Sequence, residues 1–138
     1  MPARPLLLVA EDDPDDQLLI QDAIDMSCST DIETHFVWDG IELINYLQGG
    51  ADGVGKPDLL VLDLNMPRKD GRDALREIKM NPELAKIPVA VLTTSINERD
   101  AQYCQQWGVV GYYQKPSSMM ELIEIIGGLC TNYLGCEL

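Results

Sequence analysis

Histidine and basic residues are scarce in this 138-residue chain, which has one His and 10 Lys and Arg against 23 Asp and Glu. A catalytic Ser-His-Asp or Cys-His arrangement has only His35 to draw on, and an apolar and aromatic segment around it is typical of a structural histidine. The formal net charge of -13 disfavours nucleic acid and anionic membrane surfaces as partners, because both bind through clustered Lys and Arg. This charge favours cations and basic protein surfaces.

Paired metal-binding cysteines and long apolar runs are also missing. Cys28, Cys104, Cys130 and Cys136 include no C-x-x-C pair, and one histidine beside them makes a zinc site improbable. No apolar run reaches the length of a membrane span, and the amino terminus lacks the pattern of a signal peptide. These absences predict a cytoplasmic protein with reduced thiols and no membrane association.

Repeats, low-complexity tracts and linkers are absent as well. Apolar residues make up 46% of the chain and charged residues 24%, which indicates a globular rather than a disordered protein. A length of 138 residues suits one domain of ordinary size. We therefore expect a single domain over residues 1–138, without a second folded unit.

An unbroken apolar run over residues 59–62 ends at the carboxylate of Asp63. A run without alternation is typical of a strand that is buried on both faces, in the middle of a parallel sheet. An acid at the carboxyl end of such a strand lies in the crevice where open α/β sheets bind ligands. The alternative is that Asp63 only forms a turn before Pro67, because both residue types favour turns. The run by itself does not decide between the two.

Five expected strands alternate with five expected helices along the chain. The strands are residues 5–10, 33–38, 59–62, 87–92 and 109–114, and the helices run over about 14–27, 41–47, 71–80, 95–107 and 117–134. Asp13 before Pro14 suits a helix N-cap, and Ser95 with Glu98 fits a capping box. The alternation predicts an α/β fold, a flavodoxin-like doubly wound (βα)5 sandwich whose parallel sheet has the strand order 2-1-3-4-5.

Polar side chains follow four of these strands. Glu11 and Asp12 come after the first strand, Asp63 after the third, Thr93 after the fourth and Lys115 after the fifth. The carboxyl ends of parallel strands meet at one edge, so these side chains converge on one crevice. Crowded carboxylates raise one another's pKa unless a divalent cation neutralises them, and Mg²⁺ prefers such oxygen ligands. A lysine and a hydroxyl beside them can hold a phosphoryl group.

Four motifs in this order closely resemble the receiver domain of two-component response regulators, over residues 5–134. The motifs are Val9-Ala10-Glu11-Asp12-Asp13, Leu62-Asp63-Leu64-Asn65-Met66-Pro67, Val91-Leu92-Thr93-Thr94-Ser95 and Gly111-Tyr112-Tyr113-Gln114-Lys115-Pro116. The resemblance implies a signalling phosphoacceptor rather than an enzyme, which takes a phosphoryl group on Asp63 in a Mg²⁺-dependent reaction. Two departures are mild: Glu11 replaces a more frequent Asp, and Thr94 stands where a smaller residue is common.

The resemblance also implies a ligand set for the metal. Asp12 and Asp63 would bind Mg²⁺ directly, together with the backbone carbonyl of Asn65. Glu11 would act mostly through water.

Further roles implied by the resemblance concern the phosphoryl group and its readout. Thr93 would bond a phosphate oxygen and form a switch pair with Tyr112. Lys115 would pair with the phosphate, and the bond between Lys115 and Pro116 would be cis.

The implied partners are a sensor histidine kinase or phosphotransfer protein and, on the output side, a target or a second copy. The usual output or homodimer surface of such domains is built from the fourth helix, the fifth strand and the fifth helix. With no effector domain attached, the output would come through a partner. Residues 65–71 and 93–95, with the glycine-rich loop at 49–57, look like the stand-alone receivers associated with bacterial phytochrome-type kinases.

Three other functions stay open. A metal-dependent phosphohydrolase of the haloacid dehalogenase type also phosphorylates an Asp at a strand end, but that class has a second Asp where this chain has Asn65. A flavodoxin-like FMN binder needs Ser, Thr and Gly in its first loop, which is acidic here. A receiver that binds its partner without phosphorylation would carry the same residues.

Overall fold

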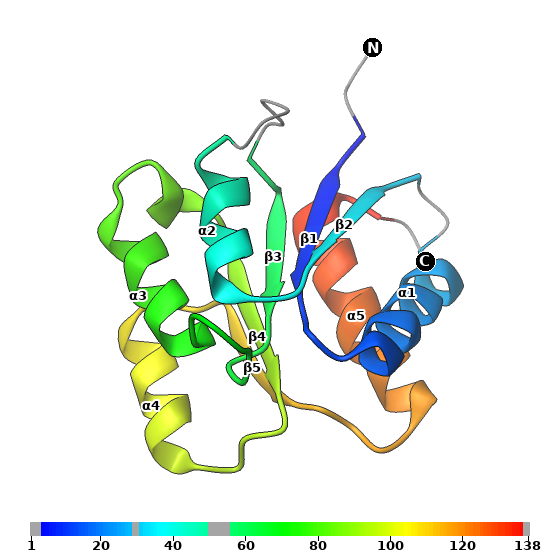
Figure 1. Cartoon of the computed structure of the whole chain (residues 1–138). Coiled ribbons are helices and arrows are strands. Elements are labelled where there is room, and N and C mark those ends of the chain that lie inside the picture. Colours follow the sequence, from blue (N-terminus) through cyan, green and yellow to red (C-terminus); the bar gives the residue numbers. More distant parts are fainter. Residues whose placement is uncertain (1–3, 29–30, 50–55, 137–138) are drawn as a thin grey trace.

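Five parallel strands form one sheet in the order β2-β1-β3-β4-β5 in the computed structural model, which describes residues 4–28, 31–49 and 56–136 (Figure 1). The strands are β1 (Leu6–Ala10), β2 (Glu33–Val37), β3 (Leu59–Leu62), β4 (Val89–Thr93) and β5 (Gly111–Gln114). The predicted strand order is confirmed. Residues 50–55 of the glycine-rich loop lie outside the described residues.

Helices cover both faces of the sheet (Figure 1). They are α1 (Pro14–Ser27), α2 (Gly40–Leu47), α3 (Gly71–Met80), α4 (Glu98–Gln106) and α5 (Met119–Leu134), with a short 3₁₀-helix η1 (Leu84–Lys86) before β4. The predicted (βα)5 sandwich is thereby confirmed, while η1 was not predicted. Among the described residues, none of these helices combines the length and apolar character that crossing a membrane requires.

The two faces of the sheet have separate cores because successive strand side chains point in opposite directions. Leu8 and Leu60 pack with α2, α3 and α4, whereas Leu7 and Leu59 pack with α1 and α5. All residues of β1, β3 and β4 are buried, as expected for strands that are apolar on both faces. The central strands are therefore a rigid support for the residues at their carboxyl ends.

Local capping explains most helix starts, with one correction. Asp13 caps α1 as predicted, through a hydrogen bond that its side chain accepts from the N–H of Asp15. The predicted capping box at Ser95 is wrong, because Asn97 caps α4 by accepting from the N–H of Arg99. The Ser95 hydroxyl instead donates to a carboxylate within α4, as described below.

The fifth strand begins at Gly111, two residues later than predicted. The N–H of Val109 bonds to the carbonyl oxygen of Cys104, at 3.3 Å, and so closes the end of α4 instead of joining the sheet. The two apolar residues at 109 and 110 therefore belong to the segment that precedes β5 and not to the strand.

A disulfide bond joins Cys28 and Cys136, so the prediction of four reduced thiols is wrong for this pair. Cys28 follows α1, and Cys136 follows the left-handed Gly135 that ends α5. Because α1 and α5 lie side by side on one face of the sheet, the two Cα atoms are 5.8 Å apart despite a sequence separation of 108 (Figure 1). Cys104 and Cys130 are buried thiols.

Candidate functional site

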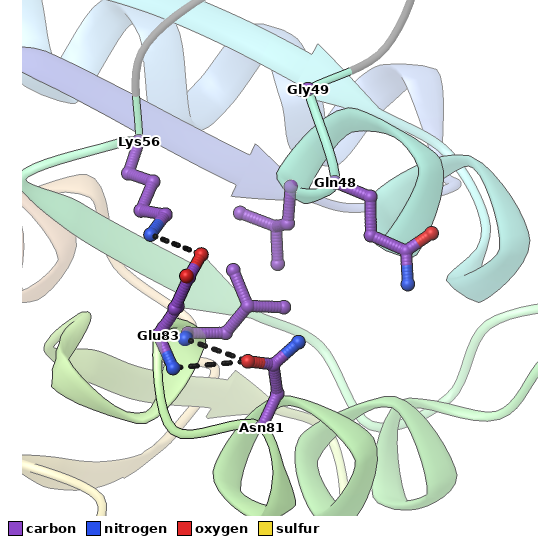
Figure 2. A pocket seen from close by; sticks show the side chains of 7 residues that line it. Gln48, Gly49, Lys56, Asn81 and Glu83 are labelled. Carbon is purple, nitrogen blue, oxygen red and sulfur yellow. Dashed lines mark hydrogen bonds and ion pairs between the residues drawn. The ribbon is translucent and has the colours of Figure 1, made fainter.

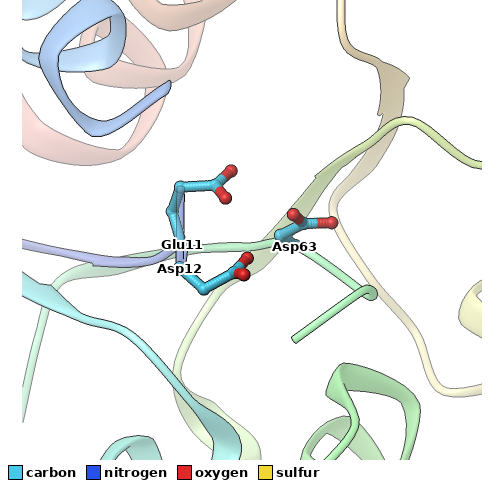
Figure 3. A group of neighbouring side chains, drawn as sticks. All are labelled: Glu11, Asp12 and Asp63. Atoms are coloured by element: carbon cyan, nitrogen blue, oxygen red, sulfur yellow. The ribbon is translucent and has the colours of Figure 1, made fainter. Parts of the chain in front are cut away.

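Three carboxylates meet at the carboxyl ends of β1 and β3 (Figure 3). Glu11 and Asp12 follow β1, and Asp63 follows β3, in adjacent strands whose last residues are paired. One oxygen atom of each lies within 4.8 Å of the others. Glu11 and Asp63 are buried, whereas Asp12 is exposed. Such a group of oxygen ligands, open to solvent on one side, can hold a hard divalent cation.

Asp63 both forms a turn and faces the crevice. Its Oδ1 accepts a hydrogen bond from the N–H of Asn65 at 3.1 Å, which is the turn that the alternative interpretation expected. Its Oδ2 accepts from Nζ of Lys115 at 3.1 Å. The turn therefore uses one carboxylate oxygen and leaves the other directed toward Lys115.

Lys115 reaches this cluster from the end of β5. Its Nζ is 2.6 Å from Oε1 of Glu11 and 2.7 Å from Oδ2 of Asp16, both closer than Asp63. The expectation of a cis bond before Pro116 is wrong, because no peptide bond among the described residues is cis. The trans form is the intrinsically preferred isomer even before proline, and Lys115 makes its three contacts with it.

Burial and charge shift two pKa values at the site. Burial lowers the pKa of Lys115, but hydrogen bonds to Asp16 and Glu11 and the charge of Asp63 outweigh it, so this pKa lies above its ordinary value. Burial raises the pKa of Glu11 to about 7, although the bonds from Lys115 and from the N–H of Asp13 oppose the rise. The ammonium thus stays charged and holds a set of carboxylates that its single charge does not neutralise.

Thr93 and Tyr112 both contact Ser95, in the loop that follows β4. Thr93 is buried at the end of β4, and its Oγ1 accepts a hydrogen bond from the N–H of Ser95 at 3.3 Å. Tyr112 is half-buried on β5, and its hydroxyl donates to the carbonyl oxygen of Ser95 at 3.4 Å. The structure therefore connects the two residues of the predicted switch pair through one loop residue.

Two features of the site were missed by sequence analysis. Asp16 was not among the predicted site residues, yet it contacts Lys115. Its third position in α1 is a signal that could have found it, because a side chain there reaches back past the helix start. The other feature is a contact between Arg72 and Asp100, for which the sequence has no local signal.

A surface pocket lies at the end of the sheet opposite to the carboxylates, where β3 begins (Figure 2). It has a volume of about 560 Å³, and its lining residues are Leu47, Gln48, Gly49, Lys56, Asn81, Glu83 and Leu84. Lys56 pairs with Glu83 at 3.4 Å, and Oδ1 of Asn81 accepts from backbone N–H groups. These polar groups lie at the other end of the sheet from the carboxylates, and their partners are one another and the local backbone, so they add no chemistry to the acidic cluster.

Comparisons with known proteins agree on one family. Residues 7–127 match the family model described as the response regulator receiver domain. The chain is 39% identical to the response regulator Rcp1 of Synechocystis sp., over 94% of this chain and 88% of that protein. It is similar to the crystal structure of the phosphorylated cyanobacterial phytochrome response regulator RcpA, with a TM-score of 0.87, 38% identity and coverage of 96% and 95%. It is also similar to the crystal structure of the Mn²⁺-bound form of the response regulator Rcp1, with a TM-score of 0.86 and 36% identity over 94% of each chain.

Proposed function

Since the chain belongs to the response regulator receiver domain family, we propose that it is a phosphorylation-controlled switch whose phosphoacceptor is Asp63. The observation that carries this proposal is the placement of the Asp63 carboxylate, which contacts Lys115 and lies within 4.8 Å of two further acids. The phosphoryl donor would be a phosphohistidine on a sensor histidine kinase or a phosphotransfer protein. Its phosphorus–nitrogen bond breaks as an Asp63 oxygen bonds to phosphorus.

The acidic cluster fits Mg²⁺ by its chemistry, because all three side chains offer oxygen ligands and one faces solvent. Asp12, Asp63 and the carbonyl of Asn65 would hold the ion, with Glu11 acting through water. When bound, the ion neutralises charge on the transferring phosphoryl group. The similarity to the Mn²⁺-bound form of Rcp1 supports this assignment, since Mn²⁺ and Mg²⁺ both suit carboxylate and carbonyl ligands.

The remaining site residues stabilise and read the phosphoryl group in this proposal. Lys115 places its ammonium against a phosphoryl oxygen, and Thr93 turns its hydroxyl toward another. Movement of Thr93 would break its bond with Ser95, and Ser95 also accepts from Tyr112. Phosphorylation would then change the face formed by α4, β5 and α5, where Met120 is exposed. A target protein or a second copy would bind there.

Hydrolysis as the main activity is less well supported. A haloacid dehalogenase would use a second carboxylate two positions after the nucleophile, but Asn65 offers an amide there. That amide donates to Oγ1 of Thr94 at 3.3 Å. We therefore assign the chain a signalling role in the cytoplasm rather than an enzymatic one.

The test is intact-protein mass spectrometry after incubation with acetyl phosphate and Mg²⁺. Wild type should gain a single phosphate, whereas Asp63→Asn and a chelator-treated wild type should gain none. Circular dichroism of Asp63→Asn checks that the variant is folded. An adduct that persists in folded Asp63→Asn would contradict the assignment of Asp63, and a wild type without adduct would favour partner binding without phosphorylation.

A further inference from the structure

Asp16 is the one carboxylate that contacts Lys115 without belonging to the acidic cluster, among the residues that the structure describes. It stands in the first turn of α1, on the helix that packs against α5. Its Oδ2 lies 2.7 Å from Nζ of Lys115, compared with 3.1 Å for Oδ2 of Asp63. The ammonium is thus paired more closely with Asp16 than with Asp63.

The surroundings of this ion pair strengthen it. Asp16 and Lys115 both line a small cavity of about 40 Å³ whose other walls are largely apolar, formed by Leu19, Ile20, Leu92, Pro116 and Leu122. The side chain of Lys115 is only 15% exposed and that of Asp16 is 28% exposed. Solvent therefore screens this pair less than it screens an ion pair on the open surface.

A bound cation would weaken the attraction between the acidic cluster and Lys115 but not that between Asp16 and Lys115. A divalent cation held by Asp12 and Asp63 would offset two of the three negative charges of the acidic cluster, which consists of Glu11, Asp12 and Asp63. Asp16 keeps its charge, because it is not one of those ligands. In the metal-loaded protein the Asp16 carboxylate would therefore compete with the incoming phosphoryl group for the ammonium of Lys115.

We propose that Asp16 is a positioning residue that holds Lys115 back from the phosphoryl group and so limits the rate of Asp63 phosphorylation. This inference rests on the proposed function, because it needs Asp63 to accept phosphate. Replacing the Asp16 carboxylate by an amide removes the competing charge and leaves a side chain of the same size. Lys115 is then available to the transferring group from the start.

The experiment measures the rate constant of adduct formation from acetyl phosphate and Mg²⁺ by mass spectrometry. Asp16→Asn should react about three- to tenfold faster than wild type, in the range of coupling energies between contacting groups. The matched control is Asp15→Asn, which makes the same charge change one residue away at an exposed position. It should stay within about twofold of wild type, because long-range charge effects are screened. Asp16→Glu keeps the charge and should restore a slow rate.

The background variant Lys115→Met separates positioning from a general structural effect. There Asp16→Asn should accelerate the reaction no more than Asp15→Asn does, because the group that Asp16 acts through is gone. Equal rates for Asp16→Asn and Asp15→Asn in the wild-type background, a slower Asp16→Asn, or an acceleration that survives Lys115→Met would each overturn the inference. A wild type that forms no adduct would instead overturn the proposed function, and this inference with it.

Discussion

The guanidinium of Arg72 on α3 donates two hydrogen bonds to the carboxylate of Asp100 on α4, from Nε to Oδ1 at 2.7 Å and from Nη2 to Oδ2 at 2.6 Å. Asp100 is buried, and its Oδ2 also accepts from the hydroxyl of Ser95 at 2.5 Å. Ser95 contacts Thr93 and Tyr112 as well. The pair therefore fixes α4 and the loop in which we expect phosphorylation to be read.

Loss of this pair should destabilise the fold in a pH-dependent way. The hydrogen bond from Arg72 holds the pKa of Asp100 at about 2, below its ordinary value. A lowered pKa in the folded state stabilises the protein above the unfolded pKa, and that contribution disappears as the pH falls toward 2. At pH 6 the shift corresponds to about 2 kcal/mol of unfolding free energy, falling to about half near pH 3.

Urea unfolding of wild type and Asp100→Asn at the two pH values measures this contribution. The gap in unfolding free energy between them should narrow as the pH is lowered. Glu124→Gln, at an exposed position of α5, is the control for loss of one negative charge and should show a small gap at both pH values. A gap for Asp100→Asn that does not change with pH would contradict the assigned ion pair.

Mg²⁺ should stabilise the folded chain through the acidic cluster. Binding to the folded state alone adds about 1.4 kcal/mol at a Mg²⁺ concentration ten times the dissociation constant. The melting temperature of wild type should therefore rise with millimolar Mg²⁺, and that of Asp12→Asn should rise much less. Asp22→Asn, exposed on α1, is the matched control and should respond like wild type. An equal response of Asp12→Asn and Asp22→Asn would refute the metal site.

Gly71→Ala should damage the support behind Asp63. A Cβ at Gly71 would lie 2.6 Å from Cα of Leu64 and still closer to the carbonyl oxygen of Asp63, so the backbone at Asp63 and Leu64 would have to move. We expect a loss of about 1–3 kcal/mol in unfolding free energy, typical of overpacking, together with slower phosphorylation.

Gly128→Ala on α5 is the matched control for this change. Nothing lies within 4 Å of a Cβ built there, so the variant should keep the wild-type phosphorylation rate and gain up to about 1 kcal/mol in helix stability. The interpretation of Gly71 fails if the two alanine variants behave alike in both measurements.

The disulfide between Cys28 and Cys136 should make stability sensitive to reductant. A bond that closes a loop of about a hundred residues stabilises a fold by up to about 5 kcal/mol, chiefly by restricting the unfolded chain. Dithiothreitol should lower the melting temperature of oxidised wild type. It should leave the melting temperature of Cys136→Ser unchanged, because that variant cannot form the bond. Reduced wild type and Cys136→Ser should then melt at similar temperatures. An oxidised wild type that melts no higher than Cys136→Ser would show that the bond does not stabilise the fold.

The amino-acid sequence by itself determined the strand order and the residues at the strand ends. The apolar runs before Glu11 and Asp63 have no alternation, which indicates strands buried on both faces, and parallel topology then brings their carboxyl ends together. Asp13 before Pro14 likewise marked the start of α1, since capping depends on neighbours in the chain. These features follow from local patterns, which a sequence displays directly.

Only the tertiary structure decided which distant groups meet. The contacts of Lys115 with Asp16 and of Arg72 with Asp100 join residues that are 99 and 28 positions apart, and no local pattern shows which distant residue each of them will meet. The disulfide depends on the packing of α1 beside α5. Ser95 does not cap α4 because its hydroxyl donates to the buried carboxylate of Asp100. A charged acceptor makes a stronger hydrogen bond than a neutral one. Packing brings such partners together, and the sequence does not show which of them will meet.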